Sequence, residues 1–82
     1  MQENKALNQR DLYASAFAKI SPDVTSDDRK AAMKELELGK ITIINYLGGK
    51  KIMNFDTAQK LLNFFNNRIS DREKEILEII NN

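Results

Sequence analysis

Apolar residues recur at helical spacing through most of the chain and are separated by short polar breaks. The first such stripe predicts a helix over about residues 5–20, with Asn4 as its N-cap. Ser21-Pro22-Asp23 ends this helix, because Pro disfavours helical geometry in the residue before it. No alternating strand pattern is evident, so the chain is predicted to be all-α. The residues of this first stripe are Leu12, Tyr13, Ala16, Phe17 and Ile20.

Two short helices with a tight bend between them are predicted next. One starts near Thr25 or Ser26, where the residues up to Asp28 resemble a capping box with Asp in place of the usual Glu. The next starts near residue 40 and ends at Gly48-Gly49, since Gly commonly follows a helix C-terminus. The residues expected to face the core from this pair are Ala32, Met33, Leu36, Ile43, Tyr46 and Leu47.

Two further helices complete the expected bundle of about five in a single domain, residues 1–82. Asn54 caps the fourth, which is predicted to end at Asn66-Asn67. Ser70-Asp-Arg-Glu73 has the pattern of a capping box and predicts a fifth helix over about residues 70–80. The expected core residues of the two are Phe55, Ala58, Leu61, Leu62 and Phe65, then Ile76, Leu77 and Ile80. Phe64 and Ile79 lie off these stripes and are candidates for a dimer surface.

Composition excludes most chemistry. The 82 residues contain no Cys and no His, so disulfides, thiolate metal sites, His bases and Ser-His-Asp triads are ruled out. Glu35 and Glu37 are two residues apart and do not share a helix face. We therefore expect no enzyme activity, cofactor, metal site or small-molecule ligand. No membrane span or signal peptide is evident, and a cytoplasmic location is expected.

The net charge of +1 is a weak signal, but its distribution is informative. Residues 1–39 sum to −1, residues 40–68 to +4 and residues 69–82 to −2. The positive excess lies on and just after the predicted third helix, where phosphates would require it. A solvated surface face is the alternative explanation for such a cluster.

The predicted third helix has two distinct faces. Ile43, Tyr46 and Leu47 share one face through their i, i+3, i+4 spacing and are expected to be buried. The opposite face carries Lys40, Ile41, Ile44, Asn45 and Gly48.

An ordered series of short motifs runs through this part of the chain: Lys34-Glu35-Leu36, Thr42-Ile43, Tyr46-Leu47, Gly49-Lys50 and Phe55-Asp-Thr-Ala-Gln-Lys-Leu61. In these motifs residues 29–66 resemble the phage-repressor and Cro-like (lambda-repressor-like) family of helix-turn-helix DNA-binding regulators. The resemblance implies a helix-turn-helix at about residues 26–49 whose second helix enters the major groove. It also implies that Glu37 occupies the bend, where the family usually has a left-handed Gly.

The resemblance assigns roles to the residues around this helix. Apolar contact of the Ile pair with thymine methyl groups, and an Asn–adenine pair, would favour an AT-rich site. The expected base contacts are Lys40, Ile41, Ile44 and Asn45. The expected phosphate contacts are Arg29, Lys30, Thr42, Lys50 and Lys51, with amides at the start of the second helix as further donors.

Two functions remain open at this point. The first is a sequence-specific regulator of transcription, of phage, plasmid or mobile-element type, that binds double-stranded DNA as a homodimer and represses by occupying its site. The second is a protein–protein interaction module, an adaptor or inhibitor, whose Ile41 and Ile44 pack against a protein partner.

Overall fold

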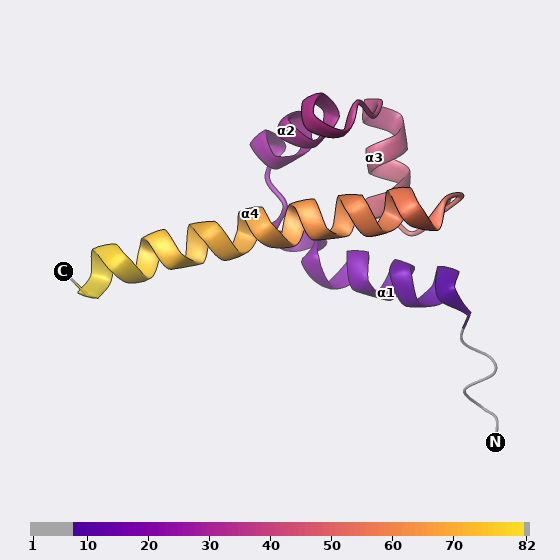
Figure 1. The fold of residues 1–82 in the computed structure, drawn as a ribbon. Coiled ribbons are helices and arrows are strands. Elements are labelled where there is room, and N and C mark those ends of the chain that lie inside the picture. Colours follow the sequence, from indigo (N-terminus) through magenta and orange to yellow (C-terminus); the bar gives the residue numbers. More distant parts are fainter. Residues whose placement is uncertain (1–7, 82) are drawn as a thin grey trace, which may run out of the picture.

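The computed structural model describes residues 8–81, and every regular element in that range is helical. α1, α2 and α3 gather around the first half of a much longer α4 (Figure 1). The all-α prediction is confirmed, but the number of α-helices is four instead of five. The elements are α1 (Gln9–Ile20), the short 3-10 helix η2 (Ser21–Asp23), α2 (Ser26–Leu36), α3 (Lys40–Leu47) and α4 (Phe55–Asn81).

α1 begins at Gln9, later than the predicted start at residue 5. Asn8 is its N-cap, and the side-chain oxygen of Asn8 accepts a hydrogen bond from the Asp11 amide at 2.9 Å. Asn4, the expected cap, lies outside the described residues. Of the predicted apolar stripe, Phe17 is wholly buried, whereas Leu12 is 56% exposed.

The bend between α2 and α3 has the predicted register. Glu37 is left-handed, with φ 55° and ψ 46°, and it is the one non-Gly residue with positive φ among those described. The Leu38 amide donates back to the Met33 carbonyl at 3.2 Å, which satisfies a carbonyl at the end of α2. Gly39 is extended and serves as the N-cap of α3, so it is not the left-handed residue.

α3 ends in a Schellman motif centred on Gly49, whose φ is +70°. The Lys50 amide donates to the Asn45 carbonyl at 3.1 Å and the Gly49 amide to the Tyr46 carbonyl at 3.0 Å. A Cβ on Gly49 would lie 3.0 Å from the Cβ of Ala14. Gly is therefore required here both by the backbone conformation and by the close approach of α1.

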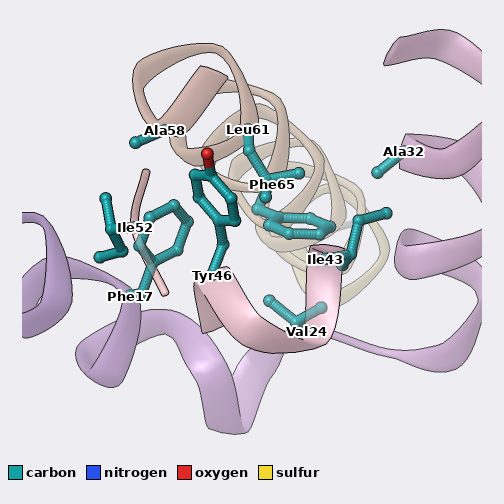
Figure 2. Packing of buried hydrophobic residues seen from close by; sticks show 9 residues of the cluster. All are labelled: Phe17, Val24, Ala32, Ile43, Tyr46, Ile52, Ala58, Leu61 and Phe65. Carbon is teal, nitrogen blue, oxygen red and sulfur yellow. The ribbon is translucent and has the colours of Figure 1, made fainter. Parts of the chain in front are cut away.

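The core lies where the first half of α4 crosses the three shorter helices (Figure 2). The Phe17 ring meets the Tyr46 ring edge to face, with centroids 6.2 Å apart. Most of the predicted core positions in residues 17–65 are buried, but Phe55, at the start of α4, is 39% exposed, so its prediction as a buried residue was wrong. The buried apolar residues are Phe17, Val24, Ala32, Ile43, Tyr46, Ile52, Ala58, Leu61 and Phe65.

α4 runs without a break from Phe55 to Asn81, so the predicted end at Asn66-Asn67 and the separate fifth helix were wrong. No Gly or Pro occurs in this range, and two Asn residues cost only a fraction of a kcal/mol each in a helix. Arg68 and Arg72, one helical turn apart, both bind the Asp28 carboxylate. Both residues lie within the continuous helix and flank Ser70, where the fifth helix was expected to start.

The last part of α4 projects past the other helices (Figure 1). Ile76, Leu77, Ile79 and Ile80 are 54–76% exposed. Placing three of them in the core was wrong, because no other described element extends far enough to cover them. Phe64, in contrast, packs within the domain against Phe65, with ring centroids 6.0 Å apart.

Candidate nucleic-acid interface

α3 presents one buried and one exposed face, as its spacing predicted. Ile43 and Tyr46 are buried, whereas Ile41 is 72% exposed and Ile44 48% exposed. Leu47 is half-buried against the core. An exposed Ile pair on a short helix is an unusual surface for an isolated domain, and it identifies this face as a candidate for contact with another molecule.

Tyr46 fixes the loop that follows α3. Its hydroxyl accepts a hydrogen bond from the Asn54 amide at 3.1 Å and donates to the Asn54 carbonyl at 3.4 Å. The Asn54 side chain in turn accepts from the Thr57 amide at 3.1 Å, which caps α4. Ile52, between these anchors, is buried. The loop that carries Lys50 and Lys51 is therefore held at both ends.

Two surface hollows flank the exposed face of α3, and each contains residues that the sequence had singled out. The hollow toward α2 is lined by Ser21, Arg29, Lys40, Ile44, Leu47 and Gly48. The hollow toward the following loop is lined by Thr42, Asn45, Tyr46, Lys51 and Met53.

Six of the nine predicted contact residues thus lie in these two hollows. Ile41 lies between Ile44 and Asn45 in angle around α3, on the exposed face. Lys30 and Lys50 are exposed and line neither hollow.

Three lysines around this face have no ion-pair partner among residues 8–81. Lys40, Lys50 and Lys51 are exposed. Both ion pairs that the structure places within residues 8–81 involve Asp28, so neither neutralises these lysines. They are available for the phosphate contacts that the sequence predicted.

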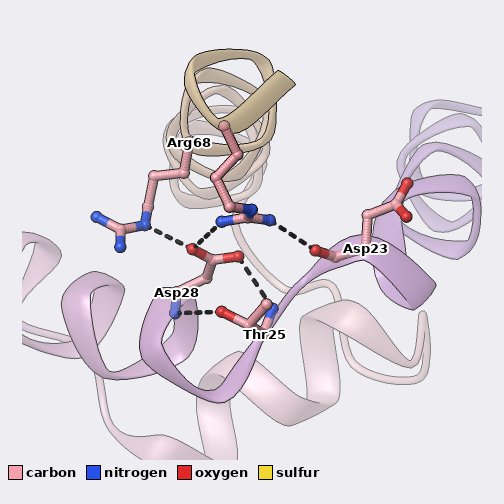
Figure 3. Close-up of polar contacts among 5 residues, drawn as sticks. Asp23, Thr25, Asp28 and Arg68 are labelled. Carbon is pink, nitrogen blue, oxygen red and sulfur yellow. Dashed lines mark hydrogen bonds and ion pairs between the residues drawn. The ribbon is translucent and has the colours of Figure 1, made fainter. Parts of the chain in front are cut away.

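Arg68 is different, because its charge is already engaged. Its Nε donates to Asp28 Oδ1 at 2.7 Å, and Nη1 of Arg72 donates to the same oxygen at 2.8 Å. Figure 3 shows the Asp28 carboxylate between Arg68 and the Thr25 backbone. Arg68 was counted in the positive excess of residues 40–68, so that excess overstated the charge available to a ligand.

Asp28 is the buried ionic centre of the domain, and its pKa is lowered. Burial alone would raise the pKa of this carboxyl, but hydrogen bonds from Arg72, Arg68 and the Thr25 backbone outweigh that effect. The same contact raises the pKa of Arg72. Nη2 of Arg72 also donates to the Asp23 carbonyl at 2.8 Å, which ties α4 to η2.

The start of α2 offers a phosphate fewer free backbone amides than a helix N-terminus would suggest. The Asp28 amide donates to Thr25 Oγ1 at 3.1 Å, and the Thr25 amide donates to Asp28 Oδ2 at 2.9 Å, which completes the predicted capping box. Asp27 adds a second carboxylate in the first turn. Arg29 and Lys30 remain candidates through their side chains.

Two features of the site were not found from the sequence. Met53 is 83% exposed beside Asn45 and Lys51. It lies in a loop, where the spacing of apolar residues does not predict which side chains are exposed. The role of Arg72 was missed because it was read as part of a helix start. Its i, i+4 spacing from Arg68 is the signal that places both guanidinium groups on one helix face.

None of the described helices combines the length and the apolar composition that a bilayer span needs. No protein-family model, curated protein or solved structure matches this chain.

Proposed function

We propose that the chain is a sequence-specific regulator that binds double-stranded DNA through α3 as the recognition helix of a helix-turn-helix. The observation that carries this proposal is an exposed α3 face, bordered by lysines without ion-pair partners among the described residues. A helix lying on a major groove needs this combination of a reading face and flanking cations.

The proposed base and phosphate contacts follow from side-chain chemistry. Asn45 pairs with an adenine, and Ile41 and Ile44 contact thymine methyl groups, which favours an AT-rich site. Lys50 and Lys51 contact phosphates from a loop fixed by Tyr46, and Arg29, Lys30, Lys40 and Thr42 complete the contact set. α3 itself carries no Arg that would pair with guanine.

Regulation would operate by occupancy. A homodimer reading a two-fold symmetric site would place two α3 helices about one DNA turn, roughly 34–36 Å, apart. Bound protein would then block polymerase, and we propose a repressor in the cytoplasm.

The test is selection from random-sequence duplex DNA at about 50 and about 200 mM salt, followed by sequencing of the retained fragments. We expect one AT-rich motif, weaker binding at the higher salt, loss of the motif in Asn45→Ala and uniform weakening in Lys50→Ala. Lys60→Ala removes an exposed lysine of α4 that lines neither hollow beside α3, and it is the matched control. No retention at either salt concentration refutes the proposal.

One observation favours a second function, a protein-binding module. Ile41 and Ile44 form an apolar pair on the exposed face of α3, and Met53 is exposed in the neighbouring loop. Such a surface fits an apolar patch on a protein partner. This function predicts binding that is insensitive to salt and is abolished by Ile41→Glu, with no affinity for DNA.

A further inference from the structure

We infer that the end of α4 is a dimerisation arm that docks onto the body of a second copy of this chain. The arm is residues 70–81, and its docking site is a hollow between α1 and α4, here called the α1–α4 hollow. This hollow is lined by Gln9, Leu12, Tyr13, Ala16 and Leu62. The inference specifies the interface of the dimer in the proposed function and rests on that part of it.

The arm carries an apolar stripe that continues a partly buried apolar stripe of the first half of α4. Phe55, Leu62, Ile69 and Ile76 follow one another at seven-residue intervals along α4. In a helix this spacing keeps the side chains close to one face. Within the domain, Leu62 and Ile69 pack against the core, whereas Ile76 has no covering element. The arm therefore exposes an apolar face of the kind that Leu62 and Ile69 pack against the core.

The arm cannot cover itself. α4 is one continuous helix and projects away from the other elements, so its end does not return to the α1–α4 hollow of its own chain (Figure 1). The hollow exposes apolar side chains of its own, Leu12 above all. One chain thus exposes two apolar surfaces that are separated along α4.

Two-fold symmetry brings these surfaces together. If two α4 helices pair antiparallel with the symmetry axis level with Ile69, Ile76 of each copy lies level with Leu62 of the other. This holds because both residues are seven positions from Ile69, in opposite directions. Leu62 lines the hollow, so each arm meets the hollow of the other copy. Both contacts form at once, which doubles the apolar area that a single arm–hollow contact would bury.

Charge favours arm-to-body contact over arm-to-arm contact. Residues 70–81 sum to −2, and residues 8–69 sum to +3. One of the two cations on the arm, Arg72, is engaged by Asp28. Two arms packed on each other would bring their excess acids together, whereas an arm on a body pairs opposite net charges.

The experiment is sedimentation of the full chain between about 1 and about 500 µM. We expect a reversible dimer whose dissociation constant rises at least about tenfold in Ile76→Glu and in Leu12→Glu. Both side chains are more than half exposed, so the fold should persist, which circular dichroism checks. Ile41→Glu is the matched control, since it places the same charge on an exposed Ile of α3 and should leave dimerisation unchanged.

Mixing two variant chains tests whether each arm docks in the hollow of the other copy. Ile76→Glu combined with Leu12→Lys should form a mixed dimer tighter than either variant forms alone, because one arm–hollow contact stays intact and the other pairs opposite charges. Loss of the dimer in Ile76→Glu but not in Leu12→Glu would overturn the inference and assign the arm to arm-to-arm pairing. A chain that stays monomeric throughout the range overturns it as well, and the arm would then await a different protein. DNA selection by such a monomer would leave the α3 proposal standing, whereas a dimer without DNA binding would refute only that proposal.

Discussion

The two parts of α4 have the same kind of sequence pattern and opposite environments. Residues 55–69 bury Ala58, Leu61 and Phe65 completely beneath the shorter helices. Residues 70–81 repeat the apolar spacing, but their Ile and Leu side chains remain exposed. Periodicity therefore identifies which face of a helix is apolar, and the ends of the neighbouring helices determine whether that face is covered within the chain.

The boundary between the two parts is ionic. Asp28 lies at the start of α2 and binds Arg68 and Arg72, and Arg72 also reaches the Asp23 carbonyl. Past this cluster no described element packs against α4 (Figure 1). The cluster thus anchors the last covered turn of the helix and leaves the arm to project.

The largest expected contrast comes from truncating one apolar side chain in each part. Phe65→Ala should destabilise the fold by about 3–5 kcal/mol, because it opens a cavity among fully buried residues. Ile79→Ala should change the unfolding free energy of the monomer by less than about 0.5 kcal/mol. Urea unfolding followed by circular dichroism, at concentrations where the chain is monomeric, measures both. Similar losses in the two variants would show that the arm is covered within its own chain.

The ionic boundary should give the next largest effect. Asp28→Asn keeps a side chain that can cap α2 but removes the charge that both Arg side chains bind. We expect a loss of about 2–3 kcal/mol in the free energy of unfolding. Asp27→Asn, one residue earlier and exposed, is the control and should cost only a few tenths of a kcal/mol. Equal effects of the two variants would contradict an anchoring role for Asp28.

Lowering the pH should weaken the same ionic cluster gradually, because it protonates Asp28. The pKa of Asp28 is lower in the folded chain than in the unfolded chain, so its ionic contacts stabilise the fold at neutral pH. This stabilisation is fully present above the unfolded pKa of an Asp, near pH 4, and is lost as the pH falls below it. We expect a loss on the order of 1–2 kcal/mol between about pH 5 and pH 2 that is absent from Asp28→Asn, measured by urea unfolding. The same acid sensitivity in both proteins would assign it to other carboxylates.

The sequence predicted local features well where one short-range rule governs them. The capping box from Thr25 to Asp28 follows from side-chain chemistry within four residues. The left-handed Glu37 was expected from the resemblance, which places this residue at the bend. The division of α3 into buried Ile43 and exposed Ile41 follows from the i, i+3, i+4 spacing of its buried face.

Features that depend on distant residues were missed. Arg68 and Arg72 bind a carboxylate 40 and 44 positions earlier in the chain. Their i, i+4 spacing shows that they share a helix face, but it does not show which residue they bind. The sequence also did not predict that the hydroxyl of Tyr46 holds the loop after α3. The apolar ring of Tyr46 was enough to explain its place in the core. The predicted contact residues of α3 gather around one surface, but what that surface binds stays a prediction.

The smallest expected effect concerns the site where the sequence suggested a break in α4. Asn67 is exposed and lies within the continuous helix, so replacing it with Ala substitutes a better helix former at no cost in packing. Asn67→Ala should stabilise the chain by about 0.5 kcal/mol and should slow amide exchange in residues 70–81, because fraying of the arm must begin from a stiffer segment. Hydrogen exchange resolved by residue measures this. If Asn67→Ala instead leaves exchange in the arm unchanged while Asp28→Asn accelerates it, continuity of α4 depends on the ionic cluster and not on the helix propensity of the segment around Asn67.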